Sequence, residues 1–227
     1  WTSANEAYAQ GLWADAADGY EMITDMGLES APLYCNIGNA YYKDGNVPKA
    51  ILNYERALKL DPSYEDAAVN LELMNSMIQD RIDPVPPFFL TKWFKDISYL
   101  MPSNAWAVIA VVLFALTLGL FLLFLLAPTV AGRRTGFFTG IATLVFMAFA
   151  FSFSVSQKNE YMNADKAIVI RPVTSVKSSP SSESTKDLFV LHEGTKVRVL
   201  DTVGSWNNIE LADGRQGWLP ATDLELI

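Results

Sequence analysis

The chain has 227 residues, a net charge of −8 and 51% hydrophobic residues, with one cysteine, Cys35, and one histidine, His192. A single cysteine excludes an internal disulfide, and a distant Cys–His pair argues against a nucleophilic or zinc site. Residues 1–90 carry 14 acidic and 5 basic side chains, which argues against nucleic acid as a ligand because phosphates require Lys and Arg.

Residues 1–83 are predicted to form about two and a half helical hairpin repeats. Five positions with glycine, tyrosine or apolar residues recur with a period of 34 residues: Gly11, Trp13, Ala16, Tyr20 and Ile23 correspond to Gly45, Val47, Ala50, Tyr54 and Ala57. This period and the best copy, 31–64, match the tetratricopeptide pattern. A third, incomplete copy predicts a lone capping helix from Glu65 to about Arg81.

Asparagines in the same repeats predict a peptide-binding groove. Asn5 and Asn39, and likewise Asn36 and Asn70, are separated by one repeat and take helix positions on the concave side of such a stack. An asparagine amide can donate to and accept from the backbone of an extended ligand. The residues predicted to line the groove are Asn5, Asn36, Asn39, Tyr42, Lys43 and Asn70. The alternative is that the asparagines lie on a solvated helix face.

Other positions in the groove limit its chemistry. Cys35, Asp66 and Val69 stand where a tetratricopeptide groove that captures a C-terminal carboxylate would have basic residues. Specific capture of a carboxyl terminus is therefore not expected. Cys35 is predicted to be a small, shielded side chain without raised reactivity, since no cationic neighbour is evident.

Residues 84–104 form a predicted Pro-rich spacer followed by an amphipathic helix in the membrane interface, from Phe88 to Met101. The proline run could instead be a ligand for an SH3-like domain. Two apolar segments follow, Ala105–Leu126 and Gly136–Val155, with 22 and 20 residues and no charge. Each is long enough to cross about 30 Å of hydrocarbon. The sequence therefore predicts a transmembrane hairpin, with two buried core helices as the alternative.

The segment 127–135 is predicted to be a short cytoplasmic loop, because it contains Arg133 and Arg134 and no acidic residue. Both termini would then lie outside. Aromatic side chains are predicted to mark the membrane rims: Trp93, Phe94, Tyr99, Trp106 and Tyr161. Gly136 and Gly140 form a GxxxG spacing, which is either a helix-packing motif or incidental. The start at Trp1 suggests a removed leader, although a trimmed chain would look the same.

Residues 164–227 show short alternating segments separated by turn residues, which predicts a small β-barrel. The strands are expected at 167–170, 173–177, 188–191, 196–201, 206–211, 216–219 and 224–227. A Ser-rich insert at 178–185 is expected to be a long loop. Trp206 and Trp218 flank the last hairpin and are either a ligand-binding surface or part of the core.

Two resemblances extend this interpretation. The runs 34–42 and 50–62, followed by Asn70-Leu71 and the apolar hairpin, resemble the tetratricopeptide-repeat member of the Bat (Bacteroides aerotolerance) membrane protein family. The run 193–219 resembles a bacterial SH3 domain. The predicted fold is therefore α plus membrane plus small β: tetratricopeptide repeats, a two-helix transmembrane hairpin and a C-terminal SH3-like β-barrel.

The resemblance implies a two-pass protein of the bacterial inner membrane, with its N- and C-terminal domains in the periplasm. Its implied partners are the von Willebrand A-domain Bat proteins and other Bat subunits in a hetero-oligomer, linked to a MoxR-type AAA+ ATPase in stress tolerance or envelope maintenance. The expected function is a non-catalytic scaffold without cofactor or metal, because no catalytic set can be assembled from the residues. The alternative is an envelope sensor that binds peptidoglycan through the SH3-like domain.

Overall fold

The computed structural model describes residues 1–86, 88–162, 165–181 and 186–227, and for 160–162 it describes the backbone only. Several predicted features lie outside the described residues: the side chain of Tyr161 at the membrane rim, Pro87 in the spacer, Ala164 at the start of the C-terminal module, and residues 182–185 of the Ser-rich insert. The chain forms two compact units, Trp1–Val85 with Ala164–Ile227, and Pro86–Asn163.

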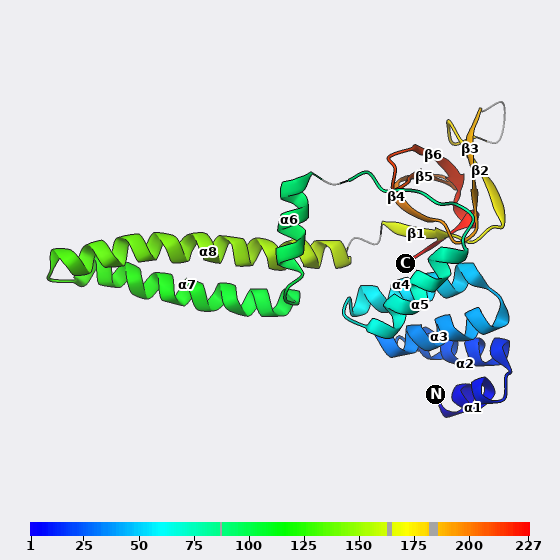
Figure 1. Ribbon diagram of the computed structural model, residues 1–227, viewed down its shortest axis with the longest axis horizontal. Coiled ribbons are helices and arrows are strands. Elements are labelled where there is room, and N and C mark those ends of the chain that lie inside the picture. Colours follow the sequence, from blue (N-terminus) through cyan, green and yellow to red (C-terminus); the bar gives the residue numbers. More distant parts are fainter. Residues whose placement is uncertain (87, 163–164, 182–185) are drawn as a thin grey trace. The chain divides into compact units, whose positions relative to one another are not determined.

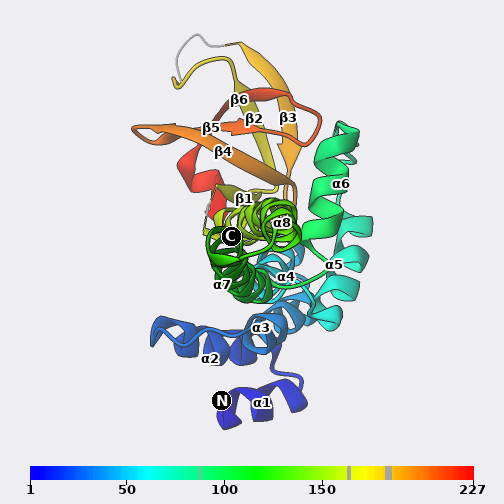
Figure 2. The same cartoon turned by 90° about the vertical axis from the view of Figure 1, so that its left-hand side faces the viewer.

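The first part of the chain is a stack of antiparallel helices (Figures 1 and 2). They are α1 (Thr2–Ala9), α2 (Trp13–Asp25), α3 (Ala31–Asp44), α4 (Val47–Leu60) and α5 (Glu65–Met77). The boundaries follow local chemistry. The Ser30 hydroxyl accepts from the Leu33 amide at the start of α3, and Gly45, with a φ of 86°, ends that helix in the left-handed conformation. The predicted helical repeats are confirmed.

The capping helix α5 is shorter than predicted, since it ends at Met77 and not near Arg81. Ile78 turns to an extended conformation and packs against the core of the repeats. Ile82, further along, packs against the core of the C-terminal sheet. The segment after Met77 is therefore a strap that joins two hydrophobic cores, and apolar contacts at both ends favour extension over another helical turn.

The C-terminal module is one antiparallel sheet. Its seven strands are β1 (Lys166–Val169), β2 (Val173–Lys177), β3 (Asp187–His192), β4 (Lys196–Val203), β5 (Trp206–Glu210), β6 (Gln216–Pro220) and β7 (Leu224–Leu226). They lie in the order β3-β2-β6-β5-β4-β1-β7. The predicted strands are present, but β3 and β7 end this order, and no pairing joins them in the described part of the chain. The sheet is not closed into the predicted barrel.

The repeats and the sheet pack against each other within their unit. Ile168 of β1 belongs to the hydrophobic core of the repeats, and Ile227 packs against that core. The turn after β3 approaches closely: a Cβ added to Gly194 would lie 2.7 Å from Cγ2 of Ile78 and 3.0 Å from Cδ1 of Ile51. Polar contacts surround this apolar centre: Lys196–Glu55 at 2.6 Å, Arg56–Glu225 at 3.2 Å and Lys59 Nζ to the Ile227 carbonyl at 2.6 Å.

The second unit contains α6 (Phe89–Ser98), α7 (Ser103–Leu126) and α8 (Val130–Met162). α7 and the part of α8 from Val130 to Asn159 are long and apolar enough to cross a membrane. Only 6% of the most apolar segment of α7 and 17% of that of α8 are buried within the described part of the chain. α6 ends at Ser98, and the Ser98 carbonyl accepts a hydrogen bond from the Trp106 indole at 2.8 Å.

The helical hairpin turns more tightly than predicted. α8 begins at Val130, where the Thr129 hydroxyl accepts from the Gly132 amide at 3.1 Å. The predicted nine-residue loop is thus reduced to 127–129, and Arg133 and Arg134 lie in the first turns of a helix. Both arginines are exposed, and the Arg133 side chain donates to the Ala127 carbonyl at 3.0 Å.

Of the two glycines in the GxxxG spacing, Gly136 makes a close contact inside this hairpin. A Cβ added to Gly136 would lie 2.7 Å from the amide nitrogen of Phe124 and 2.8 Å from the carbonyl oxygen of Leu120, both on α7. At Gly140 the nearest atom would be at 3.6 Å, an ordinary contact. Gly136 therefore permits the two backbones to approach, which is the use that small residues have between membrane helices.

Replacing Gly136 by Ala should separate the two helices and lower the stability of the hairpin by roughly 1–3 kcal/mol, because backbone atoms cannot move aside as a side chain can. The Gly140→Ala variant is the matched control and should remain close to the native protein. Thermal unfolding of the full chain in detergent, followed by helical circular dichroism, measures both. Equal effects of the two substitutions would contradict this account.

Candidate functional site

The candidate site is built on the contact between α3 and α4. A Cβ added to Gly38 would lie 2.7 Å from Cε1 of the Tyr54 ring, so only glycine lets α4 come this close. Tyr54 is 1% exposed, and its hydroxyl donates to Oδ1 of Asn39 at 2.8 Å. The glycine and the tyrosine together fix the asparagine at the surface of α3.

Asn39 joins three helices. Its side-chain oxygen accepts from Tyr54 of α4 and also from Nδ2 of Asn70 on α5, at 3.0 Å. Its amide nitrogen lies 3.9 Å from Sγ of Cys35, one turn earlier. With the Asn39 oxygen occupied, the pair can still present an N–H of Asn39 and the carbonyl oxygen of Asn70 to a ligand.

The same arrangement occurs one repeat earlier. The Tyr20 hydroxyl donates to the side-chain oxygen of Asn5, across the same fifteen-residue separation as Tyr54 and Asn39. The recurrence of Asn5 and Asn39 thus has a structural cause that sequence reasoning did not identify, since each asparagine accepts from the tyrosine of the next helix.

The other predicted groove residues are less tightly held. Asn36 and Tyr42 are half-buried on α3, and Tyr42 packs against the repeat core. Lys43 is exposed, with Nζ 5.7 Å from the centre of the Tyr42 ring. Asn39 and Asn70 are hydrogen-bonded to each other, whereas Asn5 bonds within its own repeat.

Cys35 is buried. Burial, with a further contribution from the charge of Asp66, raises the pKa of the Cys35 thiol to about 11, although the Asn39 amide lowers it slightly. At neutral pH the side chain is a thiol and not a nucleophilic thiolate. This agrees with its prediction as a shielded residue.

A tetratricopeptide repeat family model matches residues 31–64, the segment that holds α3 and α4. This segment is a tetratricopeptide repeat. Such repeats are typically non-catalytic modules that bind other proteins. A search of the curated proteins finds no match to the chain.

The two tryptophans lie on the sheet, outside the repeats. Trp206 of β5 and Trp218 of β6 are both half-buried. Ile209, three residues after Trp206, and Leu219, directly after Trp218, are fully buried and point to the opposite face, because side chains alternate along a strand. Trp206 lies opposite Pro220, and Trp218 opposite Asn208. The tryptophans are therefore on the outer face of the sheet.

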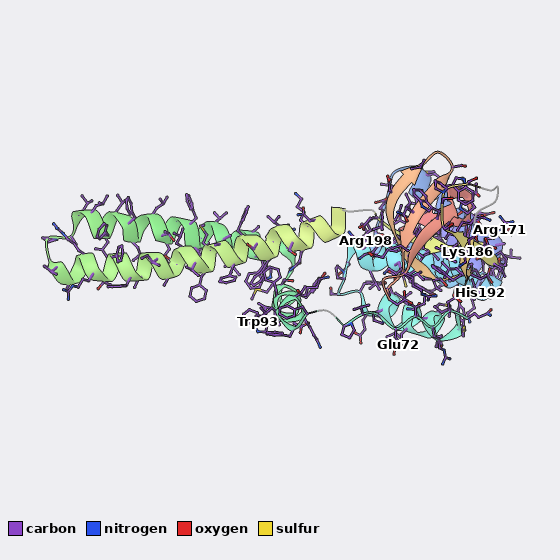
Figure 3. All side chains as sticks on the ribbon, turned by 90° about the horizontal axis from the view of Figure 1, so that it is seen from above. Glu72, Trp93, Arg171, Lys186, His192 and Arg198 are labelled. Carbon is purple, nitrogen blue, oxygen red and sulfur yellow. The ribbon has the colours of Figure 1, made fainter. Side chains whose placement is uncertain are left out.

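Sequence reasoning missed one polar cluster, which links the repeats to the sheet. Asp80 follows α5, and its carboxylate accepts from the His192 amide and from the Thr195 hydroxyl, each at 2.7 Å. The ring Nδ1 of His192, labelled in Figure 3, lies 2.8 Å from the other carboxylate oxygen. The Thr195 hydroxyl donates to the carboxylate and not to the imidazole, so this cluster is not arranged as a nucleophile and its base.

The Asp80 cluster makes the unit sensitive to acid. Partial burial alone would raise the pKa of Asp80, but the hydrogen bonds from His192 and Thr195 outweigh it and hold the pKa below the ordinary value of 3.8. A depressed pKa in the folded state contributes stability above the ordinary value, and this contribution is lost as the pH falls through the folded pKa.

The stability advantage of the native chain over the Asp80→Asn variant should therefore shrink progressively as the pH falls below about 4. Urea unfolding of the two full-length proteins in detergent, at a series of pH values, measures this difference. An advantage that stays constant or grows as the pH falls below about 4 would contradict the assignment.

Proposed function

We propose that the chain is a non-catalytic, membrane-anchored scaffold whose tetratricopeptide repeats hold a segment of a partner protein. The observation that carries this proposal is the polar rung of Asn39 and Asn70. Asn39 lies within the matched repeat, where Tyr54 of α4 holds it in place, and Asn70 lies on the helix that follows this repeat. The rung leaves an N–H of Asn39 and the side-chain carbonyl oxygen of Asn70 available, and these two groups can bond to the backbone of a peptide ligand.

The proposed anchor is the hairpin of α7 and α8, which would enter and leave the membrane on one side. Two features support it: the exposed apolar surface of both helices and the packing of the repeats and the sheet into a single unit. Modules that pack together must share a compartment, which requires an even number of membrane crossings. Arg133 and Arg134 near the tip favour a cytoplasmic turn, so that both modules would be periplasmic in a bacterial inner membrane.

We further propose, from the sequence resemblance, that the scaffold acts among the Bat membrane proteins. Its partners would be von Willebrand A-domain subunits, in a hetero-oligomer linked to a MoxR-type ATPase that serves stress tolerance or envelope maintenance. The C-terminal sheet would be a bacterial SH3-like module in this assembly.

The cleanest test replaces Asn70 and not Asn39, because Asn39 also supports the buried Tyr54. The Asn70→Ala variant should reduce recovery of the native partner by about tenfold or more in affinity purification from detergent, because the partner loses the Asn70 acceptor and Asn39 loses the neighbour that orients it. Asn75→Ala, an exposed asparagine on the same helix, is the matched control. Unchanged recovery with Asn70→Ala would remove the groove from the proposed function.

A second candidate function is peptidoglycan binding through the sheet. The observation that favours it is the position of Trp206 and Trp218 on the outer face, where tryptophan rings can stack on sugars. The test is co-sedimentation of the full chain, in detergent, with purified sacculi. This function is favoured if Trp218→Ala no longer sediments with sacculi but recovers the protein partner as the native chain does. It is excluded if the native chain sediments equally with and without sacculi.

A further inference from the structure

α5 carries an exposed apolar stripe that no other described element covers. Val69, Leu73 and Met77 are 60%, 44% and 51% exposed. They are four residues apart, so they lie along one side of the helix about 6 Å from one another. The opposite side of α5 is used inside the repeats, where Ala67 and Met74 are buried. The helix thus has one packed apolar side and one open apolar side.

The α5 stripe, Val69, Leu73 and Met77, is continuous with the candidate groove. Asn70 follows Val69 directly and precedes Leu73 by three residues, which places it on the inner flank of the stripe at about 100° per residue. This is the amide that bonds to Asn39. A ligand lying on the stripe would therefore meet the polar rung along its edge.

The charges that α5 itself carries beside the stripe are all negative. Glu65 and Glu72 lie on its outer flank and Asp66 at its N-terminal end, all three are exposed, and α5 contains no basic residue. Glu72 is labelled in Figure 3. α4 carries three cations. Arg56 bonds to Glu225 and Lys59 to the Ile227 carbonyl, so both are directed to the sheet, and Lys49 donates to the Tyr41 hydroxyl.

This charge distribution discriminates among possible occupants. Anionic lipid headgroups would be repelled by three carboxylates, and a second copy would bring the same acids against each other. A partner with Lys and Arg beside an apolar stripe would be attracted. The spacing of four residues is the spacing at which two helices interdigitate their side chains.

We propose that the α5 stripe seats an amphipathic helix of a partner protein, whose own apolar stripe is flanked by Lys and Arg. This inference rests on the proposed function of the repeats and names the partner segment that they hold. The apolar contacts supply affinity, the acidic flank sets the sign of the partner's charge, and the Asn39–Asn70 rung fixes the edge of the bound helix.

The test uses the full chain in phosphatidylcholine nanodiscs and two labelled synthetic helical peptides with the same leucine stripe, one flanked by Lys and one by Glu. Fluorescence anisotropy should show binding of the Lys-flanked peptide and at least about tenfold weaker binding of the Glu-flanked one. Leu73→Glu should weaken binding of the Lys-flanked peptide at least tenfold. Met22→Glu on α2, where Met22 is 60% exposed, is the matched control and should bind as the native chain does.

The Leu73→Glu variant adds a negative charge, so a purely electrostatic attraction would become stronger and not weaker. Stronger or unchanged binding of the Lys-flanked peptide to Leu73→Glu would overturn the inference. Dimers of the chain in sedimentation, or attachment to anionic vesicles, that Leu73→Glu abolishes would overturn it as well. The proposed function is tested separately by Asn70→Ala and the native partner. If Asn70→Ala reduces partner recovery while Leu73→Glu has no effect on peptide binding, the groove stands and the helical partner does not.

Discussion

Replacing Asp80 by Ala should loosen the C-terminal sheet from the repeats and lower the free energy of unfolding of this unit by roughly 2–4 kcal/mol. The variant leaves the His192 amide and the Thr195 hydroxyl without their acceptor. Thr195 is 2% exposed, so water cannot readily replace the lost carboxylate. The His192 ring also loses its partner at the same point.

Hydrogen exchange of the full chain, measured by mass spectrometry in detergent, locates this effect. Protection should fall in β3, in the turn that contains Gly194 and in the strap after Met77, while α7 and α8 remain unchanged. Asp83→Ala, an exposed aspartate on the same strap, is the control and should exchange as the native chain does. A loss confined to the strap, with β3 fully protected, would show that Asp80 does not hold the two modules together.

The predictable parts of this structure are those that local sequence determines. The 34-residue repeat period predicts α3 and α4, and the uncharged segments predict α7 and α8. Alternating apolar residues between glycine-containing turns predict most of the strands. The differences arise where distant residues decide. The strap leaves its helix at Ile78 because apolar cores lie at both ends, and Asp80 meets His192 across 112 positions of the chain. No periodicity or local motif contains that information.

The asparagines show why a recurring residue is ambiguous in sequence. Asn39 recurs from Asn5 at the repeat period, as a ligand-binding position would, but each also accepts from a tyrosine in the next helix. The proposed ligand contact and this packing contact would use the same residue on the same side of the helix. The hydrogen bond between Asn39 and Asn70 joins the rung to the next helix, which is why Asn70 is the residue to test.

Replacing Gly38 by Ala should destabilise the repeats by roughly 1–3 kcal/mol, although alanine has the higher intrinsic helix propensity by about 1 kcal/mol. The new methyl group would overlap the Tyr54 ring, at 2.7 Å from one ring carbon and 2.8 Å from the next. The ring cannot easily turn away, because it is 1% exposed and its hydroxyl is held by Asn39. Any movement would therefore also disturb the polar rung, and we expect binding of the native partner to fall together with stability.

A double-mutant cycle separates overlap with the ring from a general effect on α3. Urea unfolding of Gly38→Ala, Tyr54→Leu and the double variant should give a coupling energy of about 1 kcal/mol or more, with alanine less costly once the ring is gone. Tyr54→Phe keeps the ring and removes only the hydroxyl. In that background Gly38→Ala should still be destabilising, because the methyl group still overlaps the ring. It should no longer affect the position of Asn39, because the hydroxyl that joins the ring to Asn39 is gone. Strict additivity in the cycle would mean that the glycine serves the backbone of α3 and not the approach of α4.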